Sequence, residues 1–330
     1  MKGTFATNRT YAQVFATSSN VEIAETNESV GDPVDGSCAD VVVNADSLAS
    51  TSPASTSCED PATYGEAAIP YSTGWGTGYT VGHVAYVGPS GKVKLGPVLF
   101  NVQDSSGSRP VWAFGAGYLW VYELEAPRGP TVFQLSAASG RVLRATTVPP
   151  FVRPLAVANE NGLYLVGAGS YGASGSAEIV RVAPGTQRAQ VIVHGLGDYA
   201  AWAIADGDDL WSDMCQRPGN HCDIIRYHGP QLEEQFHSSD DGHTGDWAVG
   251  NAKVGIFTTV PTSTKLAPAG TNVRFDLLRI DPMTGLTQKL AVIELPQFGQ
   301  DQGVIAFKNL YLLATSQPAS SRWSIYRVNL

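Results

Sequence analysis

The sequence predicts an all-β fold built from repeated four-stranded sheets, and three observations support this. A phrase made of an apolar strand, a tight turn and a second strand recurs along the 330 residues, most plainly over 111–121. The 35 Gly and 20 Pro, with only 15% charged residues, suit many short strands joined by turns. Long helical periodicity is absent. Self-similarity at a period of roughly 40–50 residues is typical of a β-propeller, in which each repeat forms one blade.

The first two strands of each repeat can be aligned on the turn between them. Each pair joins an apolar inner strand to a strand rich in β-branched or aromatic residues, as strand chemistry prefers. The predicted inner hairpins number six and cover residues 11–26, 111–123, 155–167, 201–213, 247–259 and 304–315.

The third and fourth strands recur as outer hairpins. Their turns contain Gly or Pro, which supply the positive or fixed φ that such turns need. Five complete outer hairpins are predicted, over residues 84–100, 131–147, 178–193, 223–237 and 276–290.

The last outer hairpin is incomplete, because residues 323–330 match a third strand and the sequence then ends. An unpaired third strand would leave a sheet edge open. We therefore expect residues 2–6 to supply the fourth strand and close the ring. The count predicts one propeller domain over 1–330 with six four-stranded blades, and seven blades is the alternative.

The connections between strands differ in length. Turns inside the hairpins are short, whereas connections between second and third strands, and between blades, are longer and varied. Propeller topology puts these two classes on opposite sides of the ring, called here the short-turn face and the long-loop face. The longest connection, 27–82, is predicted to be a disulfide-tethered loop insertion in the first blade. Binding residues concentrate on varied loops held by a rigid scaffold, so the long-loop face is the predicted working face.

The four cysteines form two local pairs, Cys38 with Cys58 and Cys215 with Cys222. Their even number and local pairing predict two disulfides, which persist outside the cytoplasm. Neither pair has the spacing of a zinc site. The first residues lack an apolar leader, so the cysteines predict a secreted or extracytoplasmic protein whose signal region is not in this sequence.

The formal net charge of −9 restricts the partners. A chain of this charge repels a phosphate backbone and an anionic membrane, so nucleic acid is excluded as a partner. No stretch approaches the length of a membrane span, so no membrane insertion is expected. A protein, a peptide or a carbohydrate remains a suitable partner, and we expect a monomer.

Four of the six histidines lie between positions 221 and 243. If 223–227 pairs antiparallel with 231–237, two of these histidines lie near the long-loop end and His228 lies at the opposite face. The nearby carboxylates would complete a cluster suited to a divalent cation or to acid–base chemistry. The predicted cluster consists of His221, His237, Asp240, His243 and Asp246.

The alternative is that these are ordinary polar residues of exposed loops, because no metal-ligand spacing is recognisable. No cofactor is predicted, and a divalent cation is the group that the cluster would suit. A separate aromatic and glycine run over 71–79 contains Trp75 and Tyr79, which would stack on a sugar ring or pack on the blade beneath.

Two other sets of charged residues are predicted to be structural. The run 206–209 aligns with the hairpin turns of other repeats and has good turn chemistry. Four arginines recur at one repeat position, with a glutamine in the equivalent place, which indicates blade architecture. They are Arg181, Arg226, Arg279 and Arg327, with Gln134.

The phrases at 113–121 and 275–285, Ala-Phe-Gly-Ala-Gly-Tyr-Leu-Trp-Val and Phe-Asp-Leu-Leu-Arg-Ile-Asp-Pro-Met-Thr-Gly, resemble the repeats of bacterial YVTN/NHL-type propellers. This superfamily includes the virginiamycin B lyases, and the resemblance covers most of residues 80–330. It implies a propeller that is a binding protein, a scaffold or an enzyme, since fold alone does not assign function. In the lyases a histidine base and a magnesium-bound substrate act on the propeller top, but that motif aligns with no particular residues here.

The leading hypothesis is an exported binding or interaction module that uses its long-loop face. The alternative is a propeller enzyme, either a metal-assisted lyase or a glycan-active hydrolase, with a His/Asp site on the same face. For that enzyme His221, His237 and His243 are candidates by position alone. A third hypothesis is a structural domain of a longer surface protein.

Overall fold

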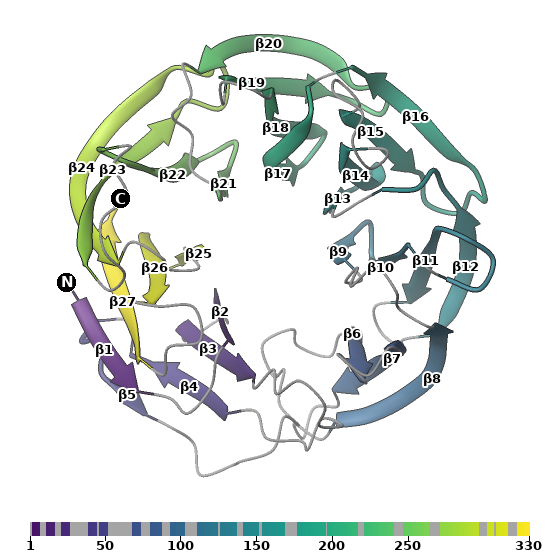
Figure 1. The fold of residues 1–330 in the computed structure, drawn as a ribbon, viewed down its shortest axis with the longest axis horizontal. Helices are drawn as coiled ribbons and strands as arrows, with labels where there is room; N and C mark the ends of the chain where they lie inside the picture. Colours follow the sequence, from purple (N-terminus) through teal and green to yellow (C-terminus); the bar gives the residue numbers. More distant parts are fainter. Residues whose placement is uncertain are drawn as a thin grey trace.

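The computed structural model describes seven antiparallel sheets that form a ring (Figure 1). All elements of regular secondary structure among the described residues are β-strands, so the prediction of an all-β propeller is confirmed. The structure describes residues 2–6, 11–16, 21–26, 39–44, 46–51, 68–73, 80–87, 93–102, 111–124, 126–136, 141–151, 154–168, 177–195, 197–216, 221–240, 247–263, 271–296, 302–306, 308–315 and 322–330.

The first three blades come from the amino-terminal half of the chain. In each of these blades the innermost strand comes first in the sequence and the chain then steps outwards (Figure 1). Blade 1 contains β2 (Tyr11–Ala16), β3 (Val21–Thr26), β4 (Ala39–Val43) and β5 (Ser50–Thr51); blade 2 contains β6 (Ala68–Thr73), β7 (Thr80–Val87) and β8 (Val93–Val102); blade 3 contains β9 (Val111–Gly115), β10 (Tyr118–Glu123), β11 (Thr131–Ser136) and β12 (Val142–Thr147).

The remaining blades follow the same plan. Blade 4 contains β13 (Leu155–Asn159), β14 (Gly162–Ala168), β15 (Ala177–Val182) and β16 (Ala189–His194); blade 5 contains β17 (Tyr199–Asp206), β18 (Asp209–Gln216), β19 (His221–His228) and β20 (Glu233–Asp240); blade 6 contains β21 (Val249–Asn251), β22 (Gly255–Pro261), β23 (Asn272–Ile280) and β24 (Thr287–Pro296); blade 7 contains β25 (Gln302–Ala306), β26 (Asn309–Thr315), β27 (Arg322–Asn329) and β1 (Lys2–Ala6).

The ring closes through its two ends, as the sequence predicts. β1 pairs antiparallel with β27, from Lys2 opposite Tyr326 to Ala6 opposite Arg322. The amino-terminal strand thereby becomes the outermost strand of blade 7, and the two ends of the chain lie near each other in the ring (Figure 1). This pairing covers the edge of β27 that would otherwise be open.

The described residues form seven blades, which is the alternative to the expected six. Residues 27–82 were expected to form one loop, but they contain β4, β5 and β6, and that expectation is corrected. β3 pairs with β4, with Ile23 opposite Val41, so the first inner hairpin is completed locally. The outer hairpin over 84–100 pairs instead with β6, in a separate sheet. β4 has five residues and β5 two, which is too short for a periodicity argument to detect.

The two faces of the ring differ in the length of their connections, as expected. In blades 3 to 6 the turns between first and second strands span only 116–117, 160–161, 207–208 and 252–254. The connections between second and third strands cover 124–130, 169–176, 217–220 and 262–271.

Burial changes from strand to strand within a blade. In blades 3 to 6 the second strands are buried along almost their whole length, as in β10 and β14, because neighbouring blades cover both of their faces. The outermost strands carry many exposed residues, as in β12. The second strands therefore read as continuous apolar runs, such as Leu-Tyr-Leu-Val in β14, rather than as alternating patterns.

The hydrophobic core is divided among the spaces between blades. Trp120 and Tyr122 of blade 3 pack with Leu163 and Val180 of blade 4. Similar clusters join blades 4 and 5, blades 5 and 6, and blades 6 and 7. Blades 4, 5 and 6 thus send alternate side chains towards both of their neighbours, and the hydrophobic effect holds blade against blade.

The recurring arginines occupy one structural position. In blades 3 to 7 a buried aromatic residue of the second strand lies directly opposite Arg, or Gln in blade 3, on the third strand. The pairs are Trp120 with Gln134, Tyr164 with Arg181, Trp211 with Arg226, Phe257 with Arg279, and Tyr311 with Arg327. The prediction that these residues belong to the blade architecture agrees with this repeat.

The third-strand residues also reach the turns of their own and neighbouring blades. Arg181 donates from Nε to the carbonyl of Asn161 in its own blade (2.9 Å) and from Nη1 to the carbonyl of Pro230 in blade 5 (2.7 Å). Arg327 of blade 7 donates to the carbonyl of Asp46 in blade 1 (2.8 Å). These bonds connect successive blades on the short-turn face.

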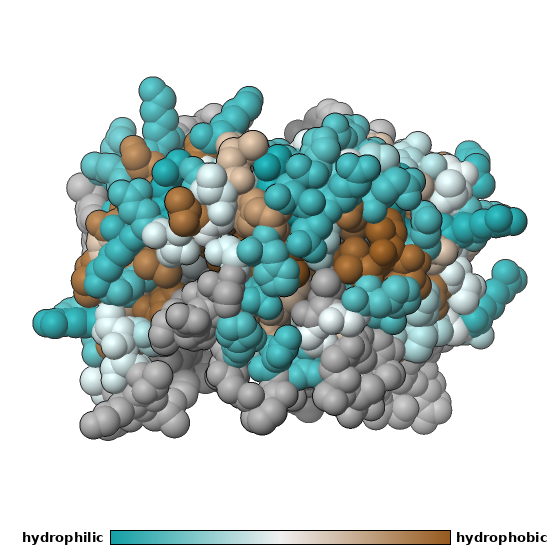
Figure 2. Space-filling model, turned by 90° about the horizontal axis from the view of Figure 1, so that it is seen from above, coloured by the Kyte–Doolittle hydropathy of each residue, from teal (hydrophilic) through white to brown (hydrophobic). Residues whose placement is uncertain are grey.

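The rim of the ring is mostly hydrophilic and has scattered apolar patches, as Figure 2 shows. Four of the large exposed hydrophobic residues of blade 6 lie on β24 and on the turn before it, and Val254 lies in the turn between β21 and β22. The four are Met283, Leu286, Leu290 and Val292.

A variant without residues 1–6 tests the ring closure. It loses the five residue pairs between β1 and β27, and cross-strand pairs contribute roughly 0.2–1 kcal/mol each. We expect the free energy of unfolding in urea to fall by on the order of 1–5 kcal/mol. Deletion of the exposed Leu330 is the control and should change stability by less than about 0.5 kcal/mol. Equal stability of the two deletion variants would contradict the closure.

Candidate functional site

The long-loop end of blade 5 is fixed by a disulfide. Cys215 near the end of β18 lies directly opposite Cys222 near the start of β19. Their sulfurs are bonded, with the two Cα atoms 4.0 Å apart. This confirms the second of the two predicted disulfides and anchors the residues on either side of Cys222, which are His221 and Asp223.

Strand geometry brings two histidines and a carboxylate together. His221 and Asp223 are two residues apart on β19 and therefore lie on the same side of the sheet. His237 on β20 lies opposite Ile225, which is on that side as well. His221 Nε2 is 3.4 Å from Asp223 Oδ1, and His237 Nε2 is 3.1 Å from Asp223 Oδ2. One carboxylate therefore joins two imidazole rings.

The members of this blade 5 cluster, His221, Asp223 and His237, differ in exposure. The Asp223 side chain is 14% exposed, whereas each histidine side chain is 47% exposed. The second ring nitrogen of His237, Nδ1, lies 3.9 Å from Glu234 Oε1. The carboxylate is thus held at the base of the cluster, and the two rings are accessible to a ligand.

The neighbouring Tyr227 takes no part as an ionisable group near neutral pH. It lies on the same side of β19 and opposite Glu234. Burial, with a smaller contribution from the Glu234 carboxylate, raises the pKa of Tyr227 well above its usual value. The Tyr227 hydroxyl therefore stays protonated near neutral pH.

The structure clarifies the predicted binding residues only in part. His221 and His237 come together as expected, and Asp240 ends β20 opposite Cys222. The other predicted site residues, and the first predicted disulfide, lie outside the described residues. These are Trp75, Tyr79, His243 and Asp246, with Cys38 and Cys58.

Sequence reasoning missed Asp223 as a member of the site. The signal was present, because the alternation of a β-strand places residues i and i+2 on one side. The expected pairing of 223–227 with 231–237 already brought His237 close to that side. A carboxylate two residues from His221 was therefore the better candidate than the more distant loop residues.

Imidazole nitrogens and carboxylate oxygens bind metal ions and transfer protons near neutral pH. The described residues contain one other group of potential ligands, Asp213 with Cys215 and Cys222, whose ligand atoms lie within 4.8 Å of one another. Its sulfurs form the disulfide, so they are not available as thiolates. The blade 5 cluster is therefore the better candidate for ligand chemistry.

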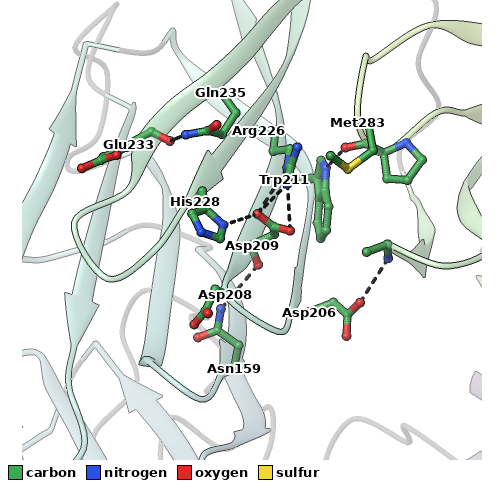
Figure 3. A network of polar contacts seen from close by, with 12 residues as sticks. Asn159, Asp206, Asp208, Asp209, Trp211, Arg226, His228, Glu233, Gln235 and Met283 are labelled. Carbon is green, nitrogen blue, oxygen red and sulfur yellow. Dashed lines mark hydrogen bonds and ion pairs between the residues drawn. The ribbon is translucent and has the colours of Figure 1, made fainter.

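His228 lies at the opposite end of β19, on the short-turn face as expected. Its Nδ1 is 2.9 Å from Asp209 Oδ1, and Arg226 donates to both oxygens of the same carboxylate at 3.1–3.2 Å (Figure 3). The Arg226 guanidinium also lies 5.9 Å from the centre of the Trp211 ring. The Asp209 charge is thus already compensated by an arginine.

The inner turns of the short-turn face are connected from blade to blade. Asn161 of blade 4 donates to Asp208 of blade 5 (3.0 Å), and Ala252 of blade 6 donates its backbone N–H to Asp206 (3.1 Å). Figure 3 shows the Asp206 carboxylate directed at a backbone nitrogen of blade 6 and the Asp209 carboxylate directed at Arg226 and His228 of its own blade. The run 206–209 forms a hairpin turn, as predicted. The carboxylates of Asp206 and Asp208 accept hydrogen bonds from neighbouring blades.

Comparisons with known proteins agree on the fold. No family model and no curated protein matches the chain. Among solved structures, the chain is similar to one in a mitotic checkpoint complex, with TM-score 0.57, 10% identity, and 99% of this chain and 95% of the other covered. It is also similar to the β-propeller domain of the Trilobed protease from Pyrococcus furiosus, with TM-score 0.52, 10% identity, and coverage of 98% and 96%.

Another solved structure, of a prolyl endopeptidase, has TM-score 0.52 and 10% identity, and the match covers 98% of this chain and 50% of that enzyme. Likeness at such low identity confirms the propeller fold and leaves the YVTN/NHL-type resemblance a prediction. Propellers of this shape occur in enzymes and in other assemblies alike, so function has to come from the site. Within the described part of the chain, no helix is long and apolar enough to cross a membrane.

Arg226→Ala tests the structural role of the short-turn network. Asp209 is only 13% exposed, and removing its arginine partner leaves a largely buried carboxylate with His228 alone. We expect the free energy of unfolding in urea to fall by about 3 kcal/mol. Arg274→Ala is the matched control, because Arg274 is 72% exposed and 3.7 Å from Glu294, and it should cost less than about 1 kcal/mol. Similar losses for both variants would contradict this role.

Proposed function

We propose that this chain is an extracytoplasmic binding module that captures its ligand on the long-loop face, with the blade 5 cluster as part of the binding surface. The observation that carries the proposal is the difference between the two faces. Polar side chains on the short-turn face bond to neighbouring blades, as Asn161, Arg181 and Asp206 do. The rings of His221 and His237 are half exposed at the other end of blade 5.

Charge and redox chemistry narrow the ligand class. The net charge of −9 disfavours polyanions and suits a protein, a peptide or a carbohydrate. The disulfide between Cys215 and Cys222 supports a location outside the cytoplasm, where such bonds persist.

A second candidate function is enzymatic, as a metal-assisted lyase or a glycan-active hydrolase. One observation favours it, namely that the blade 5 cluster places two imidazoles on one carboxylate. This arrangement suits a general base or a metal-bound substrate. Turnover of a captured glycan or lactone, lost in His237→Gln, distinguishes this function from binding alone.

A comparison of two surface variants tests the binding function. The long-loop variant combines His221→Gln, Asp223→Asn and His237→Gln and replaces residues 217–220 with Gly-Ser-Gly-Ser. The short-turn variant carries Lys253→Ser and Met283→Ser at exposed positions. The probes are an array of neutral glycans and a library of displayed peptides. We expect the parent and the short-turn variant to capture the same probes and the long-loop variant to lose at least tenfold in affinity.

Thermal unfolding of each variant serves as the control for folding. Equal capture by the two variants, or loss in the short-turn variant alone, would contradict the proposed face. Failure of the parent chain to capture any glycan or peptide would contradict the binding function itself.

A further inference from the structure

We infer that His221, Asp223 and His237 form a site for one divalent transition-metal ion, with Zn²⁺ as the reference ion. The inference deepens the proposed function, on which it rests for its place in the molecule, because it names the ligand chemistry of the same cluster. Metal binding is measured separately from glycan or peptide capture, so either result can fail without the other.

The distance from each imidazole nitrogen to its nearest Asp223 oxygen matches the spacing between two ligands of one ion. A Zn²⁺ ion lies about 2.0–2.2 Å from nitrogen and oxygen ligands in a tetrahedral site, which puts two neighbouring ligands roughly 3.3 Å apart. The separations of 3.4 Å between His221 and Asp223 and 3.1 Å between His237 and Asp223 are close to that value. Each imidazole nitrogen is therefore already at ligand spacing from a carboxylate oxygen.

Binding of a single ion requires the two rings to close towards each other. The three ligand atoms do not all lie within 4.8 Å of one another, since the rings contact opposite oxygens of Asp223. The rings are half exposed and can rotate about their side-chain bonds. The backbone beneath them is fixed by strand pairing and by the disulfide beside His221. The required change is thus confined to side chains.

Glu234 completes the arrangement around His237. A histidine that ligates a metal through one nitrogen donates the proton of the other nitrogen to a carboxylate or carbonyl in almost every known site. His237 Nε2 faces Asp223, and its Nδ1 lies 3.9 Å from Glu234 Oε1. With the proton on Nδ1, Nε2 has its lone pair directed at the ion. Because 3.9 Å exceeds a hydrogen-bond distance, Glu234 would position the ligand His237 once its exposed side chain moves closer to Nδ1.

Two other described histidines have a carboxylate partner, but neither shares that carboxylate with a second imidazole. His194 pairs with Glu178 at 3.3 Å, without a second imidazole in the pair, and its side chain is 68% exposed. His228 shares Asp209 with Arg226, whose positive charge disfavours a cation there. Asp223 forms no ion pair with a lysine or an arginine among the residues described, and its two partners are imidazoles. The blade 5 cluster therefore combines two imidazole rings with one carboxylate that has no lysine or arginine partner among the described residues.

The ligand set also predicts selectivity. Imidazole suits zinc, nickel, copper and iron, whereas calcium and magnesium prefer sites made of oxygen ligands. We expect Zn²⁺ and Ni²⁺ to bind with one ion per chain and Ca²⁺ to bind at least tenfold more weakly.

The test is calorimetric titration of the untagged full chain with Zn²⁺ and with Ca²⁺ at pH 7.5. Reductant is left out, because reduction would free the two sulfurs beside Asp213 and create a competing thiolate site. His221→Gln and His237→Gln should each weaken Zn²⁺ binding at least tenfold, and Glu234→Gln should weaken it less. His194→Gln is the matched control and should bind as the parent does. X-ray absorption of the Zn²⁺-loaded chain should show two imidazole ligands.

Unchanged Zn²⁺ affinity and stoichiometry in a variant that combines His221→Gln with His237→Gln would overturn the site, as would equal affinity for Ca²⁺. Variants that keep the melting temperature of the metal-free parent separate loss of the site from loss of folding. Capture of a glycan or peptide by the EDTA-treated chain, with no Zn²⁺ binding, would overturn the metal site and leave the proposed function standing. Zn²⁺ binding without capture of any glycan or peptide would support the metal site and contradict the proposed binding function.

Discussion

The repeated contact between a buried aromatic residue and an arginine on the next strand is the constraint on which this ring depends. Tyr164 with Arg181, Trp211 with Arg226 and Tyr311 with Arg327 show the same cross-strand pairing in three blades. The aromatic ring fills the space between blades, and polar groups of the same pair bond to a turn of the next blade. Trp211 itself donates from Nε1 to the carbonyl of Pro282 in blade 6 (3.0 Å). Apolar packing and hydrogen bonding to the next blade therefore act at the same point of these three blades.

Because of this constraint, polar groups on the short-turn face are used in contacts between blades. The turns of the short-turn face are short, and their polar groups are used between blades, as at Asp206 and Asp208. The opposite end of blades 3 to 6 carries the longer connections between second and third strands. In blade 5 the disulfide between Cys215 and Cys222 provides local rigidity at that end, next to the imidazole rings. A rigid support under accessible side chains is the arrangement that a binding site requires.

The parts of the fold that the sequence could predict are those with a strong repeat. The hairpins over 111–147 and 155–193, the closing strand 2–6 and the role of the arginines all follow from alignment of the repeats. The short strands β4 and β5 could not be recognised, because two to five residues surrounded by turn-forming sequence carry little periodic signal. The predicted number of blades was therefore six, whereas the described residues form seven.

The candidate site was predictable to a similar degree. The proximity of His221 and His237 follows from antiparallel pairing, and Asp223 follows from strand alternation once that pairing is accepted. The contact of His237 Nδ1 with Glu234 depends on the β-bulge between Arg226 and Tyr227, which shifts the register of β20. Single-residue shifts of this kind have no clear sequence signature, so the finer geometry of the cluster does not follow from the sequence.

Amide hydrogen exchange tests most directly whether links between blades hold the ring. The backbone N–H of Gly185 bonds to Gln134 of blade 3 (3.4 Å), and that of Ala252 bonds to Asp206 of blade 5 (3.1 Å). The N–H of Lys253 bonds only within its own turn, to Asn251, and serves as the reference. The account predicts that Gly185 and Ala252 exchange only in large-scale opening of the ring, much more slowly than Lys253. Exchange of all three amides at the rate of an open surface turn would contradict it.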